Sequence, residues 1–140
     1  MKILLATDGS DHSKAAVNSV AERPWPEGSE VKIVSATEIP NVPATETWAL
    51  PGSYYAELHG AAKARAEAAV KDAAERIKAG KKPGLKITTE VKNGHAKEVI
   101  LDEAERWGAD LIVLGSVSHT VATHAHCSVE IVRLKTRAEK

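Results

Sequence analysis

The chain has 140 residues, the size of one domain, and 19 Lys and Arg residues balance 19 Asp and Glu residues. A zero net charge without a basic excess argues against nucleic acid as a partner. No run of about 18 apolar residues and no signal-peptide pattern occurs, so we expect no membrane association and a cytoplasmic location. A single cysteine, Cys127, excludes an intramolecular disulfide and fits a reducing compartment.

Apolar runs alternate with amphipathic stretches along the chain, which is typical of strands alternating with helices. The runs at 2–7 and 111–114 are almost wholly apolar, as in strands buried on both faces of a parallel sheet. Gly9 allows a tight turn after the first strand, and Ser10 or Asp11 can cap the helix that follows. The predicted strands are 2–7, 30–38, 86–92, 111–114 and 128–133, and the predicted helices are 13–22, 54–79, 96–107 and 117–125.

This order predicts an α/β fold of the Rossmann-like or flavodoxin-like kind, with a five-stranded parallel sheet and helices on both faces. We expect residues 1–140 to form a single domain whose charged tail, 134–140, is frayed. Ligands of such sheets bind at the carboxyl ends of the strands. There, Gly115 and Ser116 link a strand to a helix that starts at Val117, a geometry that aims free N–H groups at an anion.

Three motifs together resemble the universal stress protein (UspA-type) family over nearly the whole chain. They are the opening Ile3-Leu4-Leu5-Ala6-Thr7-Asp8-Gly9-Ser10, the strand Ala109-Asp110-Leu111-Ile112-Val113-Leu114-Gly115-Ser116, and the C-terminal stretch from Ser116-Val117-Ser118 to Ile131-Val132-Arg133. The resemblance implies the adenine nucleotide alpha-hydrolase-like fold. It also implies that the protein is a module that binds ATP and acts in stress response, either through a conformation that depends on the ligand or through partner binding.

The resemblance also implies which residues meet the nucleotide. Thr7 and Asp8 match the adenosine end of the family's site, and Ala36 matches a position whose backbone meets the adenine edge. Gly115, Ser116 and Val117 match the phosphate end. Each also has a structural interpretation: a turn Asp that caps a helix, a core alanine, and an ordinary strand-to-helix turn with a capping serine.

One feature of the family's nucleotide-binding members is missing. Their glycine loop has a Gly, two residues, a Gly, nine residues, and a Gly before Ser or Thr, whereas here Gly115-Ser116 leads at once to Val117-Ser118. Either the protein lacks this loop or the encoding gene carries a segment between Ser116 and Val117 that the chain lacks. Because both flanks match the loop-bearing pattern closely, we favour the second interpretation.

Three classes of function remain open. The first is the ATP-binding module, and the second is a nucleotide-free homodimeric interaction module of the same family. The third is an enzyme that activates ATP, for which no pyrophosphate loop or general base is visible, so we expect at most weak ATP hydrolysis and assign no catalytic residue.

Two further hypotheses concern the C-terminal region. His119, His124, His126 and Cys127 suggest a metal cluster, but the first two are five residues apart and diverge on a helix, so we expect no metal site. The strand at 128–133 is short and followed by a charged tail, so we expect it to form a sheet edge. The resemblance implies a homodimer through this strand, with Val129, Ile131 and Arg133 at the interface.

Overall fold

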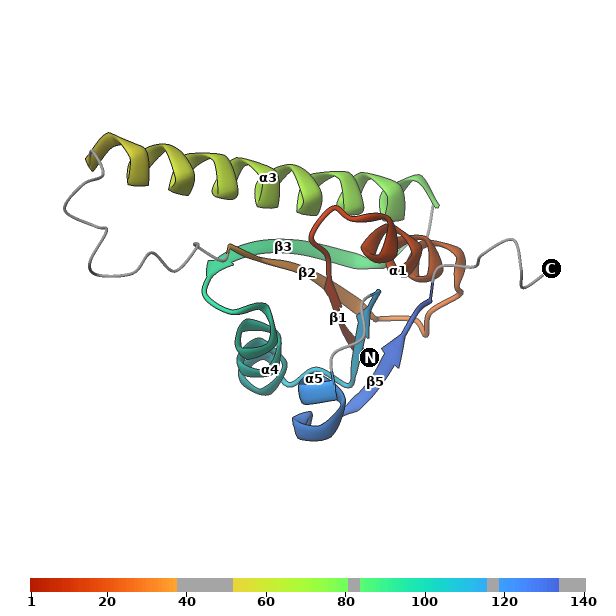
Figure 1. Cartoon of the computed structure of the whole chain (residues 1–140). Helices are drawn as coiled ribbons and strands as arrows, with labels where there is room; N and C mark the ends of the chain where they lie inside the picture. Colours follow the sequence, from red (N-terminus) through yellow and green to blue (C-terminus); the bar gives the residue numbers. More distant parts are fainter. Residues whose placement is uncertain (38–51, 81–83, 116–118, 134–140) are drawn as a thin grey trace, which may run out of the picture.

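The computed structural model describes residues 1–37, 52–80, 84–115 and 119–133. Five parallel strands form one sheet in the order β3-β2-β1-β4-β5 (Figure 1). The predicted α/β architecture, a five-stranded parallel sheet covered by helices on both faces, is therefore confirmed. The strands are β1 (Lys2–Ala6), β2 (Glu30–Thr37), β3 (Lys86–Asn93), β4 (Leu111–Leu114) and β5 (Ser128–Ile131), and the helices are α1 (Asp11–Glu22), α3 (Gly52–Ala79), α4 (Ala96–Trp107) and α5 (His119–His124).

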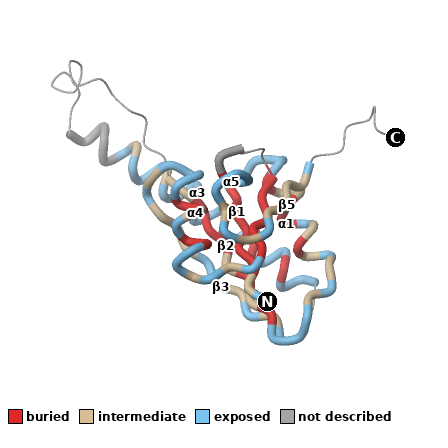
Figure 2. Tube along the Cα trace, turned by 90° about the horizontal axis from the view of Figure 1, so that it is seen from below, coloured by how far each residue is buried: buried red, intermediate tan, exposed pale blue. Residues whose placement is uncertain are grey.

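The helices divide between the two faces of the sheet. α1 and α3 cover one face, where Val17, Val70 and Ile77 pack against Leu5 and Ile33. The two helices α4 and α5 cover the other face, with α4 contributing Val99, Ile100 and Ala104 and α5 contributing Val121. Figure 2 shows the buried residues concentrated in the central strands β1, β2 and β4 between these layers.

The predicted boundaries that fall in the described residues hold within one or two residues. α1 begins at Asp11 because Ser10 is its N-cap, and its side chain accepts a hydrogen bond from the backbone N–H of Ser13. The prediction that β5 extends to Arg133 is wrong, since the strand ends at Ile131, opposite Leu114, where the neighbouring strand β4 also ends. The beginning of the predicted 117–125 helix lies outside the described residues, as does the stretch 38–51.

A buried carboxylate interrupts the otherwise apolar contact between α4 and the sheet. Glu103 is 4% exposed and accepts hydrogen bonds from the ammonium groups of Lys32 on β2 and Lys92 on β3. Glu90 also pairs with both lysines, at 3.2 and 3.5 Å. Although burial opposes the charged form, the two lysine hydrogen bonds outweigh it and lower the pKa of Glu103 from 4.5 to about 2. We call these four residues the Glu103 cluster.

Candidate functional site

The site is built on the turn that joins β1 to α1. Gly9 adopts a φ of 83°, a left-handed conformation that favours glycine. It also lies close to α3, because a Cβ at this position would be 3.5 Å from the Cβ of Ala69. The turn brings the backbone N–H of Ser10 to 2.8 Å from Asp8 Oδ1, to which it donates a hydrogen bond. Asp8 is thereby held at the carboxyl end of β1.

The Asp8 carboxylate is stabilised in its ionised form. Partial burial acts to raise its pKa, but hydrogen bonds from the side chain and backbone of Ser10 and from the Ser13 side chain outweigh burial and lower the pKa below 3.8. At neutral pH this group is therefore a hydrogen-bond acceptor only, suited to a ligand hydroxyl or amine.

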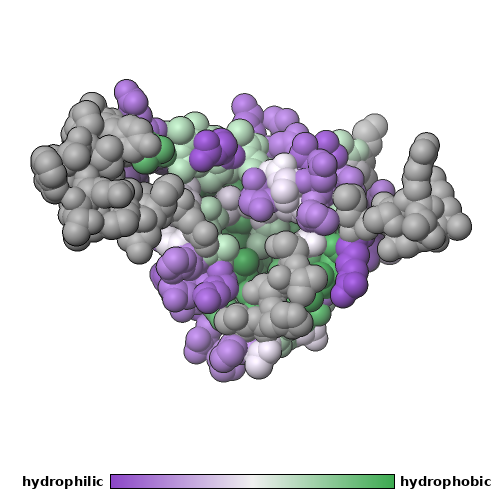
Figure 3. Space-filling view, viewed as in Figure 1, coloured by the Kyte–Doolittle hydropathy of each residue, from purple (hydrophilic) through white to green (hydrophobic). Residues whose placement is uncertain are grey.

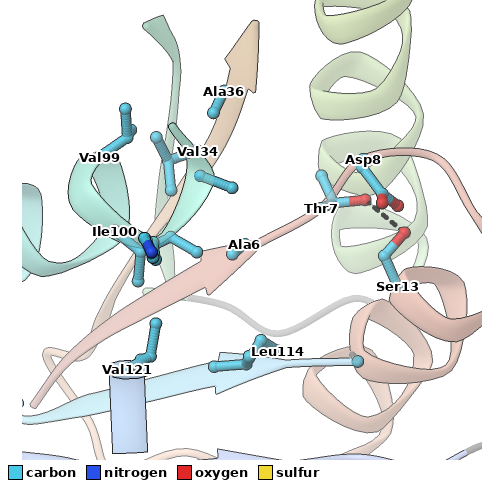
Figure 4. A pocket seen from close by; sticks show the side chains of 13 residues that line it. Ala6, Thr7, Asp8, Ser13, Val34, Ala36, Val99, Ile100, Leu114 and Val121 are labelled. Atoms are coloured by element: carbon cyan, nitrogen blue, oxygen red, sulfur yellow. Dashed lines mark hydrogen bonds between the residues drawn. The ribbon is translucent and has the colours of Figure 1, made fainter. Parts of the chain in front are cut away.

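Two buried hydroxyls lie beside Asp8. Thr7 Oγ1 lies 3.1 Å from Ser13 Oγ, and Ser13 Oγ lies 2.9 Å from the Ser10 carbonyl oxygen, so both hydroxyls are hydrogen-bonded within the protein. The pair fixes the β1 end against α1, and Figure 4 shows Asp8 beside these two hydroxyls.

A hollow of about 120 Å³ opens at the carboxyl ends of β1, β2 and β4. Its walls are apolar apart from Asp8, Thr7 and Ser13 at one end and Lys97 from the first turn of α4. Figure 4 shows Thr7, Asp8 and Ser13 together on one side and the apolar side chains of Val34, Val99, Ile100 and Val121 on the other. In the space-filling view, apolar side chains gather in the middle of this face, with hydrophilic ones on either side (Figure 3). We call this space the base hollow.

Gly115 closes the base hollow at the end of β4. A Cβ there would lie 1.9 Å from the carbonyl oxygen of His12 and 2.7 Å from the backbone N of Ser13, so no side chain fits. The backbone of β4 therefore rests directly on the first turn of α1. This contact requires glycine for lack of space, whereas the sequence indicated only a turn.

The predicted site residues are partly assembled. Thr7, Asp8, Ala36 and Gly115 all line the base hollow. Ser116 and Val117 lie outside the described residues. The remaining wall was not predicted from the sequence. Val99 and Ile100 carry a signal that could have identified them, because they fall on the apolar stripe of α4 that faces the carboxyl ends of the strands.

The residues considered as metal ligands near the C-terminus have different neighbours. His126 Nε2 lies 3.9 Å from Glu105 Oε2, and burial together with the charge of Asp110 raises the pKa of the Cys127 thiol. The side chain of His119 is outside the described part. In the described ranges, no group of three or more His, Cys, Asp or Glu residues could hold a metal ion. None of the described helices is long and apolar enough to span a membrane.

The β5 strand is an edge of the sheet, as predicted, and among the described strands it pairs with β4 alone. Val129 and Ile131 are half-buried on one face, where they pack on the α4 and α5 layer, while Arg133 is exposed. On the other face, Glu130 forms an ion pair with Arg23 at 2.6 Å.

Fold and site together define a doubly wound α/β domain with a ligand hollow at the carboxyl ends of its central strands. The sequence profile of the universal stress protein family matches residues 1–118, and the chain belongs to that family. No curated protein matches it.

Solved structures of this family have the same fold. A UspA protein from Lactobacillus plantarum is 24% identical with a TM-score of 0.70, and the match covers 95% of this chain and 97% of that one. An Arabidopsis thaliana family member, solved with AMP bound, is 17% identical with a TM-score of 0.72, covering 99% and 94%. A universal stress protein in complex with cAMP is 21% identical with a TM-score of 0.56, covering 94% and 95%. At these identities the likeness shows the fold.

Proposed function

We propose that this domain binds an adenine nucleotide in the base hollow and acts in stress response through ligand-dependent conformation or partner binding. The main support for this proposal is an apolar hollow with an ionised carboxylate at one end, that of Asp8, which accepts a hydrogen bond from the Ser10 N–H. A purine ring is flat and largely apolar, and a ribose presents hydroxyl donors to such a carboxylate. The AMP and cAMP complexes of two structural relatives agree with this assignment.

Four described residues form the proposed site. Thr7 and Gly115 shape it, Asp8 accepts ribose hydrogen bonds, and Ala36 borders the base at the end of β2. Ser116 and Val117 remain the proposed phosphate end on sequence grounds. ATP as the ligand depends on a glycine loop next to them, because a triphosphate needs several backbone N–H donors.

Calorimetric titration with AMP and ATP tests the proposal. Asp8→Ala should weaken binding by about 1.5–3 kcal/mol, the usual worth of a hydrogen bond to a charged group. Asp11→Ala is the matched control, since it removes an exposed carboxylate three residues away, in the first turn of α1. Equal losses in both variants, or no binding by the parent, would reject the site. Mass spectrometry first establishes whether the protein has the 14.9 kDa of this chain or carries an additional loop.

The second candidate function is a nucleotide-free homodimer through β5, and one observation favours it. β5 is a sheet edge with half-buried Val129 and Ile131 on one face, and a two-fold axis would let the strand pair with its own copy. Arg133 would flank that interface. The two functions are compatible, because β5 does not line the base hollow.

A further inference from the structure

Both outer strands of the described sheet are edges, and β3 is the longer of the two. It has eight residues, whereas β5 has four, and among the described strands it pairs with β2 alone. The register with β2 runs unbroken from Lys86 to Asn93, so no bulge turns this edge away, and the strand contains no proline. Short length, bulges, prolines and charges are the usual protection of an edge against pairing with another chain. β3 has only the charges, and these are of both signs.

The outward backbone groups of β3 belong to its odd-numbered residues. The Lys86 N–H donates a hydrogen bond to the Ser29 carbonyl oxygen, on the side of β2. Successive residues of a strand direct their N–H and C=O groups to opposite sides, so the even-numbered residues bond to β2. The residues whose groups point outward, where a further strand could bond to them, are therefore Ile87, Thr89 and Val91.

The two faces of β3 differ in chemistry. Half-buried apolar side chains lie at the margin of the core on the face toward α3, and they are Leu85, Ile87 and Val91. The opposite face carries the polar residues Lys86, Thr88, Glu90 and Lys92. The side chain of Lys86 is 69% exposed and that of Glu90 is 34% exposed. A partner strand could therefore cover apolar surface on one face and meet charges on the other.

The charges select a register for pairing with a second copy of the same strand. A two-fold axis makes the two strands antiparallel, and the outward groups require odd residues to face odd residues. With the axis at Thr88, Lys86 of each copy lies opposite Glu90 of the other, so opposite charges meet twice. With the axis at Thr89, Lys86 would face Lys92 twice, and with the axis at Glu90 two carboxylates would face each other.

One other axis position within β3 also pairs opposite charges. An axis at Val91 would set Glu90 against Lys92, but Lys92 is already bonded within the Glu103 cluster and its side chain is 23% exposed. That register would also overlap a shorter part of the strand. The axis at Thr88 uses Lys86 instead, whose ion pair with β2 is long, at 3.8 Å.

We propose that β3 is a self-pairing edge, on which a second copy of this chain docks antiparallel about a two-fold axis at Thr88. Lys86 and Glu90 supply the charge complementarity, and Leu85 of each copy meets Val91 of the other on the apolar face. This contact is separate from pairing through β5 and leaves the base hollow open, because β3 does not line it. Two short strands form a small interface, so we expect a weak association with a Kd of about 0.1–1 mM.

Disulfide trapping in the full chain tests the register. In a Cys127→Ser background, Thr88→Cys sets two thiols in a directly opposed pair with Cα atoms about 4.5 Å apart, a separation that a disulfide spans. Oxidation with diamide, at a protein concentration near the expected Kd, should give a covalent dimer. Thr89→Cys is the matched control, because this neighbour is also exposed but would face Ile87 of the second copy, and it should yield about 10-fold less dimer.

Sedimentation equilibrium up to about 1 mM tests the charges. With pairing through β5 blocked by Ile131→Glu, the chain should still form dimers at the upper concentrations. Lys86→Glu in this background should weaken that association at least about 10-fold, because it sets two carboxylates against each other, whereas Lys86→Arg should keep it. Circular dichroism establishes that each variant is folded.

Each outcome decides the proposal. Selective crosslinking of Thr88→Cys, together with weaker association of Lys86→Glu, supports it. Equal yields from Thr88→Cys and Thr89→Cys, or an association that Lys86→Glu leaves unchanged, overturns the register and its charge pairs. A folded chain that stays monomeric at all concentrations and gives no covalent dimer overturns self-pairing, and the edge is then open only to a strand of a different protein.

Discussion

Replacing Glu103 by glutamine tests whether the Glu103 cluster is a source of stability. The substitution keeps the volume of the side chain but removes its charge. The ammonium groups of Lys32 and Lys92, whose side chains are 19% and 23% exposed, would then share Glu90 as their remaining carboxylate in the cluster. Breaking a buried ion pair from one side leaves an uncompensated charge, which destabilises proteins strongly.

The pKa of Glu103 sets the magnitude. A shift from 4.5 to about 2 corresponds to roughly 3 kcal/mol of stability at neutral pH, because one pKa unit is worth about 1.4 kcal/mol. For a domain of this size we expect Tm to fall by about 10 °C in Glu103→Gln. A salt bridge between exposed groups would contribute less than about 1 kcal/mol.

The same shift predicts a pH dependence with a definite sign. The folded-state pKa is depressed, so the stabilisation is complete above the unfolded-state pKa of 4.5 and is lost as the pH falls toward about 2. Between pH 7 and pH 3 the parent should lose about 2 kcal/mol through this group. Glu103→Gln lacks this contribution, so the difference in stability between parent and variant should shrink over the same interval.

Urea denaturation followed by circular dichroism at several pH values between 7 and 3 measures both effects. Glu105→Gln is the matched control, because this neighbour on α4 has a side chain that is 68% exposed and should lose less than about 1 kcal/mol. Equal losses in the two variants, or a difference for Glu103→Gln that stays constant from pH 7 to pH 3, would refute the reasoning.

Three further predictions address other parts of the molecule. Gly115→Ala should destabilise the protein by about 1–3 kcal/mol, because the new Cβ would clash with the backbone of His12. Gly60→Ala is the control, since no atom lies within 4 Å of its new Cβ, and it should stabilise α3 by up to about 1 kcal/mol. Thermal unfolding compares the two variants, and a Gly115→Ala variant as stable as the parent would contradict the close contact. In sedimentation, the parent should be a dimer at micromolar concentration and Ile131→Glu a monomer, and a monomeric parent or an unchanged dimer rejects pairing through β5. Because the pKa of the Cys127 thiol is raised, iodoacetamide should alkylate the native protein more slowly than the urea-unfolded chain at pH 8, and equal rates would argue against the packed position of this residue.

Much of the fold is determined by local sequence. Continuous apolar runs such as Leu111–Leu114 require burial on both faces, and their alternation with amphipathic stretches leaves a parallel α/β sheet as the compact arrangement. Helix ends are also encoded locally, as at Gly108, whose left-handed conformation ends α4. The pattern predicted a site at the carboxyl ends of the parallel strands, and Thr7, Asp8, Ala36 and Gly115, which the resemblance to the family implied, line one hollow there.

Other features depend on the tertiary structure alone. Glu103 lies 71 residues from Lys32, and only the packing of α4 across the register of β2 and β3 brings the two together. Periodicity says which side of an element is buried, but the partners on that side are set by strand order and helix placement, which arise from contacts distant in sequence.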